Sequence, residues 1–361
     1  MPVIDPSLPV LDLTATSVEL TRQLCNIESV SGNERTIADA IEAALAGVSH
    51  LEVIRDADAI VARTTLGRAR RVVIAGHIDT VPVNANLPVL EQDGHLVGRG
   101  TVDMKGGVAV ALKLAVELDT PTVDLTWIFY DHEEVDSALN GLGRLARNRP
   151  DLLEGDFAIL GEPTSATVEG GCNGTARADI RLHGTRAHSA RSWAGHNAIH
   201  DAAPVLAILA AYEPAQIEVD GLVYREGLNA VGISGGIAGN VIPDEAVVSV
   251  NYRFAPSRSA ADAVEHLNEV FAGFDIQVTD LAEGARPGMD APLAREFLAA
   301  VGGVARPKYG WTDVARFSAL GIPAVNYGPG DPMLAHADDE RVSVQEILAC
   351  ERGLRAWLTA G

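Results

Sequence analysis

The stretch 124–134 constrains the fold of this 361-residue chain more than any other, because an apolar run ends there abruptly in charge. Residues 125–130 are almost continuously apolar, which is typical of a strand buried on both faces of a sheet. Residues 131–134 then read Asp-His-Glu-Glu. In open α/β sheets, binding sites lie at the carboxyl ends of the strands. Because burying adjacent carboxylates is costly without positive charge, we expect a metal ion at this strand end.

Strands and helices alternate along the first half of the chain. Short apolar strands are predicted at 71–75 and 157–160, and a strong helix is predicted at 108–118. Alternation of this kind is typical of a parallel sheet that is covered by helices. The predicted fold class is therefore α/β, with a mostly parallel sheet flanked by helices.

The pattern changes after Gly171 and returns to α/β character near residue 284. The stretch between them predicts a strand, a helix, two strands, a helix and a strand, at 175–182, 197–212, 228–237, 246–254, 260–274 and 275–281. This order matches the ferredoxin-like motif. We therefore predict a large domain of residues 1–171 and 284–361, with a small ferredoxin-like α+β domain of residues 172–283 inserted into it.

Three helices are predicted to begin at capping boxes. The sequences Thr16–Glu19, Ser31–Glu34 and Ser343–Glu346 each pair a hydroxyl residue with a glutamate three positions later. In a capping box, the two side chains accept backbone N–H groups that the first helical turn leaves without partners. We therefore expect a helix to follow each of these three sequences.

Composition limits the partners and the cellular setting. The chain has 49 Asp and Glu against 28 Lys and Arg, a net charge of −21, so no nucleic-acid partner is expected. No apolar stretch reaches about 18 residues, so no membrane span is expected. Residues Met1–Asp5 lack the pattern of a signal peptide, and the three cysteines form no disulfide or zinc framework. We expect a cytoplasmic protein.

Residues of the types that bind metals follow three predicted strands. The candidates are His77, Glu134 and Glu162 at strand ends, Asp103 at a helix start and His336 in a late loop. Two histidines and three carboxylates without cysteine favour zinc, cobalt or manganese. Three carboxylates exceed the needs of one zinc ion, whereas two ions that share a bridging carboxylate would use them all. Two such ions activate a water molecule and stabilise a developing oxyanion.

Two further carboxylates have predicted roles beside these ligands. Glu133 is adjacent to Glu134 and would be available as the general base. Asp79 lies two residues from His77, on the same side of an extended chain. Its carboxylate would accept the imidazole N–H and fix the tautomer of His77.

These residues occur in five ordered blocks. The blocks are His77-Ile-Asp79, Gly98-Arg-Gly-x-x-Asp103-Met-Lys-Gly-Gly107, Glu133-Glu134, Gly161-Glu162-Pro163 and His336. Together they resemble the aminoacylase/carboxypeptidase family of co-catalytic zinc amidohydrolases, over nearly the whole chain and with an insertion where that family has its dimerisation domain. The resemblance implies a zinc-exopeptidase-like catalytic domain and a homodimer that forms through the inserted lid domain.

The same resemblance implies a role for each candidate residue. Two Zn²⁺ ions per subunit are implied, with Co²⁺ or Mn²⁺ as an alternative at one site. The implied ligands are His77 and Glu162 at one site, Glu134 and His336 at the other, and Asp103 as the bridge. Glu133 would act as the general base with support from Asp79. His188 would reach the active site of the partner subunit and help to hold the oxyanion.

Within the family, the chain most resembles the actinobacterial form of a deacylase whose substrate is a small N-acyl diamino acid. The stretches that carry this likeness are 310–317, 321–325 and 327–332. Because a polyanionic substrate requires cationic donors and Arg binds carboxylates bidentately, Arg253 and Arg316 are candidate contacts. Thr312 and Asn240 resemble further substrate contacts of the family.

One departure leaves the acyl group open. Better-known deacylases of this specificity carry an Arg-Arg pair between two glycines at the start of the small domain, where this chain has Gly171-Cys-Asn-Gly174. The alternatives are hydrolysis of another N-acyl amino acid such as acetylornithine, hydrolysis of a dipeptide, and a non-catalytic relative that only binds. The complete ligand set together with Glu133 argues against the last alternative.

Overall fold

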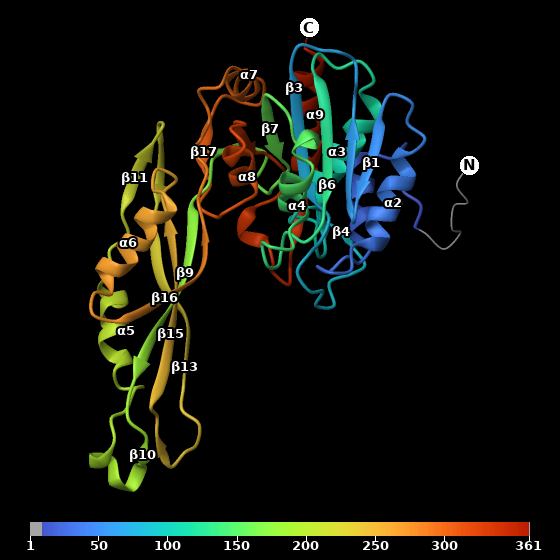
Figure 1. Ribbon diagram of the computed structural model, residues 1–361. Helices are drawn as coiled ribbons and strands as arrows, with labels where there is room; N and C mark the ends of the chain where they lie inside the picture. Colours follow the sequence, from blue (N-terminus) through green and yellow to red (C-terminus); the bar gives the residue numbers. More distant parts are fainter. Residues whose placement is uncertain (1–8, 361) are drawn as a thin grey trace. The chain divides into compact units, whose positions relative to one another are not determined.

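The computed structural model describes residues 9–360, which form two compact units (Figure 1). The first unit consists of the chain up to Gly170, Gly288–Arg306 and the chain from Arg316 onward. The second unit consists of Gly171–Pro287 and Pro307–Ala315. The segment 307–315 thus belongs with the second unit, although the sequence pattern predicts it in the large domain.

The structure bears on three expectations from composition. Residues 1–5, whose sequence lacks the pattern of a signal peptide, lie outside the described residues. Between residues 9 and 360, no helix combines the length and apolar character needed to cross a membrane. Cys25, Cys172 and Cys350 are buried free thiols.

The first unit is built on an eight-stranded sheet in the order β1-β2-β6-β3-β7-β18-β8-β17. These strands are β1 (Glu52–Asp56), β2 (Ala59–Arg63), β6 (Asp124–Tyr130), β3 (Arg71–His77), β7 (Phe157–Leu160), β18 (Ala324–Asn326), β8 (Val168–Gly170) and β17 (Ala305–Pro307). The central strands β6, β3, β7 and β18 are parallel. Strands β1, β2 and β8 pair in antiparallel fashion. The α/β prediction with a mostly parallel sheet is therefore confirmed at the centre of the sheet.

Strand β6 is buried along its whole length, as its apolar sequence predicts. Its Trp127 and Phe129 side chains belong to the main hydrophobic core. His77, the last residue of β3, is in register with Tyr130, the last residue of β6. The loops that follow both strands therefore leave the sheet at the same level.

Helix α3 (Lys105–Glu117) is the central helix of this unit, and its residues 105–115 are all buried. It contacts β3 and β6 of the sheet as well as α1 (Ser17–Cys25) and α9 (Val344–Thr359). Helix α2 (Arg35–Leu45) contacts β1 and β2. The remaining helical segments of the unit are α4 (Gly141–Asn148), η1 (Pro150–Leu152), α7 (Pro292–Ala300), α8 (Val314–Ala319) and η3 (Pro332–Leu334), with α8 beginning at the boundary of the second unit. A small sheet contains β19 (Arg341–Ser343), β5 (His95–Val97) and β4 (Leu90–Gln92).

The second unit contains a four-stranded antiparallel sheet in the order β13-β15-β9-β16. Its strands are β9 (Gly174–His183), β13 (Gly227–Gly235), β15 (Glu245–Phe254) and β16 (Asp275–Ala282), and its helices are α5 (Ala202–Ala211) and α6 (Ala260–Val270). The chain order of these elements is the predicted β-α-β-β-α-β. The smaller elements are β10 (Ala187–His188), η2 (Ser189–Ala194), β11 (Gln216–Val219), β12 (Leu222–Arg225) and β14 (Val241–Ile242).

Two of the three predicted helix starts have a hydroxyl N-cap, but their glutamates do not complete a capping box, because Glu19 accepts from Arg22 and Glu346 accepts the N–H of Gly330. Thr16 accepts the N–H of Glu19, and Ser343 accepts the N–H of Gln345. A helix follows Ser31–Glu34 as predicted, but the predicted capping box is wrong, because α2 begins only at Arg35 and has no side-chain cap. The Ser31 hydroxyl donates to Asp79 instead, and the Glu34 carboxylate accepts the N–H of His132.

Glycine at position 107 lets α3 approach the end of β7 closely. A Cβ atom on Gly107 would lie 2.1 Å from the carbonyl oxygen of Gly161, the residue that follows β7. Gly107 is buried in the first turns of α3, so neither backbone has room to yield.

Gly107→Ala is expected to lower the free energy of unfolding by about 2 kcal/mol or more, since overpacking forces backbone shifts. Gly47→Ala is the matched control, because nothing lies within 4 Å of a Cβ atom there. That control should change the free energy by no more than about 0.5 kcal/mol. Urea unfolding followed by tryptophan fluorescence measures both, and equal effects of the two substitutions would contradict the packing argument.

Candidate active site

The carboxyl ends of three parallel strands bring the sequence-predicted residues of the first unit together. His77 ends β3, Glu133 and Glu134 follow β6, and Glu162 follows β7. Strands β6, β3 and β7 are neighbours in the sheet, so their carboxyl ends meet at one edge. Asp103, just before α3, and His336, after η3, contact this edge through their side chains.

Asp103 occupies the centre of the cluster. Its Oδ1 lies 3.1 Å from Nε2 of His77, and its Oδ2 lies 3.2 Å from Nε2 of His336. Nε2 of His336 also lies 3.1 Å from the carboxylate of Glu134. Each oxygen of Asp103 therefore faces a different histidine.

Three overlapping groups of side chains in the described residues could hold a metal ion, with donor atoms in each group within 4.8 Å of one another. The groups are His77 with Asp103 and Glu162, His77 with Glu133 and Glu134, and Asp103 with Glu134 and His336. Asp103 belongs to two of the groups. Nitrogen and carboxylate donors without sulfur suit a zinc, cobalt or manganese ion.

The cluster attracts positive charge strongly. Hydrogen bonds to Asp103 and Glu134 raise the pKa of His336 to about 10. Burial opposes the charged form of His77, but Asp103 and Asp79 outweigh burial and raise its pKa well above the usual value. Burial likewise opposes the charged form of Asp103, yet the bonds from His336 and His77 hold the pKa of Asp103 below its usual range. Metal ions would provide the same compensation when they replace the two protons.

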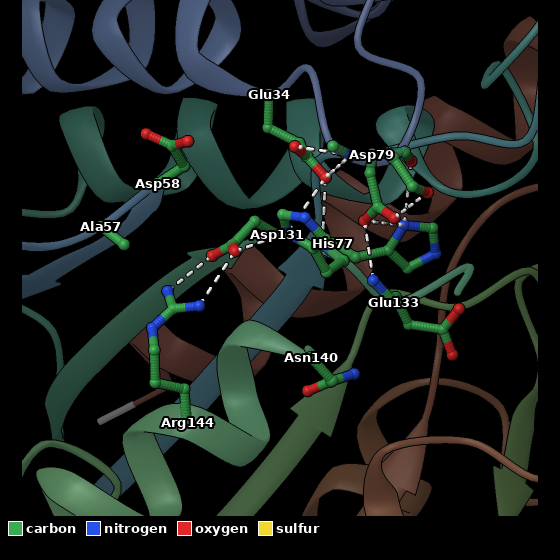
Figure 2. A network of polar contacts seen from close by, with 12 residues as sticks. Glu34, Ala57, Asp58, His77, Asp79, Asp131, Glu133, Asn140 and Arg144 are labelled. Atoms are coloured by element: carbon green, nitrogen blue, oxygen red, sulfur yellow. Dashed lines mark hydrogen bonds and ion pairs between the residues drawn. The ribbon is translucent and has the colours of Figure 1, made fainter. Parts of the chain in front are cut away.

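Asp79 lies next to His77 and is completely buried. Its Oδ1 is 3.5 Å from Nδ1 of His77, and its backbone oxygen is 3.1 Å from the same nitrogen. The carboxylate also accepts the backbone N–H groups of Glu133 and Glu134, at 3.0 and 3.1 Å (Figure 2). Burial alone would raise the pKa of Asp79, but the hydrogen bonds from His77, Ser31 and Glu133 lower it. Asp79 therefore stays charged and fixes both the imidazole and the adjacent loop.

Arg99 and Glu340 form a buried ion pair that the sequence analysis missed. The guanidinium Nη1 of Arg99 lies 2.8 Å from Oε2 of Glu340, and both side chains are almost fully buried. Oε1 of Glu340 accepts the N–H groups of Val102 and Asp103, while Arg99 donates to the carbonyl of His336. The pair thus connects the loops that carry Asp103 and His336. Arg99 stood inside a recognised block, whereas Glu340 had no local signal.

Two predicted residues of the second unit lie near each other. His188 on β10 pairs with Val241 on β14, and the N–H of Ser189 donates to the carbonyl of Asn240. His188 is exposed, and its Nδ1 accepts the N–H of Ala190. The structure therefore places His188 and Asn240 together at the β10–β14 end of this unit.

Two other predicted residues lie at the opposite end of strand β9. Arg253 pairs with Thr175 at the start of β9, whereas His183 ends the strand on the His188 side. Thr312 is connected to this start through its carbonyl, which accepts the thiol of Cys172 at 3.7 Å. Burial, together with nearby Arg177, lowers the pKa of the Arg253 guanidinium.

Arg316 packs against a neighbouring helix, and Cys172 is buried. The Arg316 guanidinium packs on α4, where a Cβ atom on Gly143 would come within 2.6 Å of it. Cys172 is buried, and this burial raises the pKa of its thiol to about 11. A thiol with such a pKa is not an activated nucleophile.

Comparisons with known proteins agree with this arrangement. Residues 73–360 match the model of peptidase family M20/M25/M40. A Mycobacterium tuberculosis protein named putative succinyl-diaminopimelate desuccinylase DapE is 56% identical, over 96% of this chain and 99% of that relative. A Corynebacterium glutamicum protein named succinyl-diaminopimelate desuccinylase is 47% identical, over 97% of this chain and 98% of the relative.

A solved structure has the same fold at low sequence identity. The Bacillus subtilis YXEP protein, described as a dinuclear metal binding peptidase, superposes with a TM-score of 0.70 at 16% identity, over 95% of this chain and 96% of that one. The fold, the cluster of donor residues, the family match and the near full-length relatives all agree. The chain belongs to peptidase family M20/M25/M40.

Proposed function

We propose that this protein hydrolyses the amide bond of N-succinyl-L,L-2,6-diaminopimelate to succinate and L,L-2,6-diaminopimelate, a step of lysine and diaminopimelate biosynthesis in the cytoplasm. The names of the two near full-length relatives support this substrate. The observation that supports the chemistry is the position of Asp103, which belongs to two groups of side chains that could hold a metal ion, with Glu133 in a third group nearby.

The donor set fits two divalent metal ions. Asp103 would bridge them, with His77 and Glu162 at one site and Glu134 and His336 at the other. Zinc is the expected metal, with cobalt or manganese as an alternative at one site. When bound, the ions would supply Lewis acidity toward the amide carbonyl and a water molecule with a lowered pKa.

Glu133 is the proposed general base. Its carboxylate lies within 4.8 Å of donor atoms of His77 and Glu134, so it reaches the region where the attacking water would stand. Figure 2 shows this carboxylate turned away from the Asp131 and Arg144 side chains. Glu133 would take a proton from the water and pass it to the nitrogen of the leaving amine, which leaves as a neutral amine.

Substrate recognition is proposed to use cationic and polar side chains. Arg253 and Arg177 lie close enough to affect each other's charge, so a substrate carboxylate would be stabilised there. Thr312 is linked to the same end of the second unit. Arg316 is a further proposed contact, and Asn240 and His188 would contact substrate from the other end of that unit.

A homodimer would explain the separation of these groups. Strand β9 between Thr175 and His183 is roughly 25 Å long at about 3.3 Å per residue, so Arg253 and His188 of one chain cannot contact the same small molecule. Strand β13 is an edge strand, and its Val231 and Ile233 are 63% and 57% exposed. An exposed apolar edge strand is suited to pairing with a second copy. His188 would then act in the partner's active site.

The substrate assignment is tested with the zinc-loaded protein and two substrates in parallel. We expect kcat/KM for N-succinyl-L,L-diaminopimelate to exceed that for N-acetylornithine by about a hundredfold or more, because a buried carboxylate contact discriminates strongly. A preference for acetylornithine or a dipeptide would retain the metal chemistry but reject the succinyl specificity. The Cys172-Asn173 departure would then be the place to examine first.

Glu133→Ala is expected to lower kcat by about a thousandfold or more, since a positioned base and the associated proton transfer are lost. Metal content, measured by elemental analysis, should stay at the wild-type value because Glu133 is not a proposed ligand. Glu134→Ala is the contrasting variant and should lose metal together with activity. Retained turnover in Glu133→Ala would contradict the proposed mechanism.

Mixing two inactive variants tests the shared site. His188→Ala subunits combined with Glu134→Ala subunits should regain about a quarter of the wild-type activity, since half of the dimers are mixed and each has one complete site. Adding Ile233→Lys to both variants should abolish the rescue by preventing dimer formation. Val304→Lys in both, a control at an equally apolar residue that is 67% exposed, should leave the rescue intact. No rescue in the first mixture would argue against sharing.

A further inference from the structure

Three successive backbone N–H groups that follow β6 are held by two buried carboxylates. The N–H of His132 donates to Oε1 of Glu34 at 3.2 Å. The N–H groups of Glu133 and Glu134 donate to Oδ1 and Oδ2 of Asp79, at 3.0 and 3.1 Å (Figure 2). The two glutamates that would hold a proton and a metal ion thus stand on a backbone segment with all three N–H groups fixed.

Glu34 comes from the segment where the predicted capping box fails. Its side chain is 1% exposed and also accepts the N–H of Gly32, at 2.9 and 3.0 Å to its two oxygens. Ser31 of the same segment donates its hydroxyl to Oδ2 of Asp79 at 2.6 Å. Ser31 therefore donates to Asp79, and Glu34 accepts from the loop after β6. Neither side chain caps α2.

His132 has a backbone conformation that requires support. Its φ of +59° lies in the left-handed region, which costs a residue with a Cβ atom about 1 kcal/mol. Nδ1 of its imidazole lies 2.8 Å from Oδ2 of Asp131 and 3.4 Å from Oε1 of Glu34. Arg144 in turn donates two hydrogen bonds to the Asp131 carboxylate. Figure 2 shows the Arg144 guanidinium directed at the Asp131 carboxylate.

We infer that Ser31, Glu34 and His132 are positioning residues for Glu133 and Glu134. The left-handed turn at His132 sets the direction in which the next two residues leave β6, and Glu34 holds that turn through both the N–H and the imidazole. Ser31 holds the other acceptor, Asp79. The inference rests on the proposed function, in which Glu133 moves the proton and Glu134 binds metal.

Glu34→Gln is the decisive variant, because it keeps the size of the side chain and removes the charged acceptor. We expect kcat to fall about tenfold or more with KM within about twofold, since a displacement of 1 Å at the reacting groups has effects of this size. In the metal-free protein, amides of residues 131–135 should exchange with deuterium at least about tenfold faster, because the His132 N–H loses its carboxylate acceptor and the N–H groups that follow the turn move with it.

Glu42→Gln, on the helix α2 that follows Glu34, is the matched control. Glu42 is an acidic residue whose side chain is 40% exposed and pairs with Arg55. It should leave both the exchange rate and kcat unchanged. Unchanged exchange at 131–135 in Glu34→Gln would overturn the inference. A fall in kcat that only follows a fall in folded or metal-loaded protein would also overturn it.

Substitutions of His132 separate the backbone conformation from the imidazole. Asn adopts the left-handed region readily, whereas Val does not. His132→Asn should therefore retain at least about tenfold more of kcat than His132→Val. Equal losses in both would overturn the proposed role of the turn. The exchange measurement needs no substrate, so it tests the positioning network even if the wild-type protein fails to hydrolyse the proposed substrate.

Discussion

The concentration of negative charge at one edge of the sheet is the constraint on which the first unit depends. Asp79, Asp103, Glu133, Glu134 and Glu162 all lie near His77, and at an effective dielectric constant of about 20 two like charges 4 Å apart repel by about 4 kcal/mol. Backbone N–H groups in fixed positions offset part of this repulsion. Buried carboxylates at Glu34, Asp79 and Glu340 each accept two or more backbone N–H groups, so the loops themselves provide positive partial charge. The remaining charge makes the cluster a strong attractor for cations.

The parallel centre of the sheet explains why this charge gathers where it does. Strands β3 and β6 end in register at His77 and Tyr130, and β7 ends beside them. Their loops can therefore present side chains to one another without long excursions. The close contact between Gly107 and Gly161 brings the start of α3 to the same edge, and Asp103 arrives with it. The position of the cluster thus follows from strand register and backbone packing, before any metal is considered.

Much of this could be predicted, because the strongest signals were local. The apolar run of β6 was read correctly as a doubly buried strand, and the predicted donors at His77, Asp103, Glu134, Glu162 and His336 lie together; their individual roles stay predictions. The edge strand β1 and its neighbour β2 were missed, and β1 gave little signal because it is only partly buried and carries charged residues. The capping box predicted at Ser31–Glu34 did not form, because these side chains bond to Asp79 and to the distant loop after β6 instead. Glu340 could not be found, since its partner Arg99 is remote in sequence.

The second unit is not one continuous insertion in the chain. The chain passes between the two units at four points rather than two, because 307–315 returns to the second unit after the chain has re-entered the first. That segment is joined to the rest of its unit by the bond from the Asn173 N–H to the Lys308 carbonyl and by the Trp311 indole on the Glu283 carbonyl. Excising residues 171–287 from the gene would therefore leave a stretch of backbone without its partners. Exchange of this unit between related genes must carry two separate coding segments together.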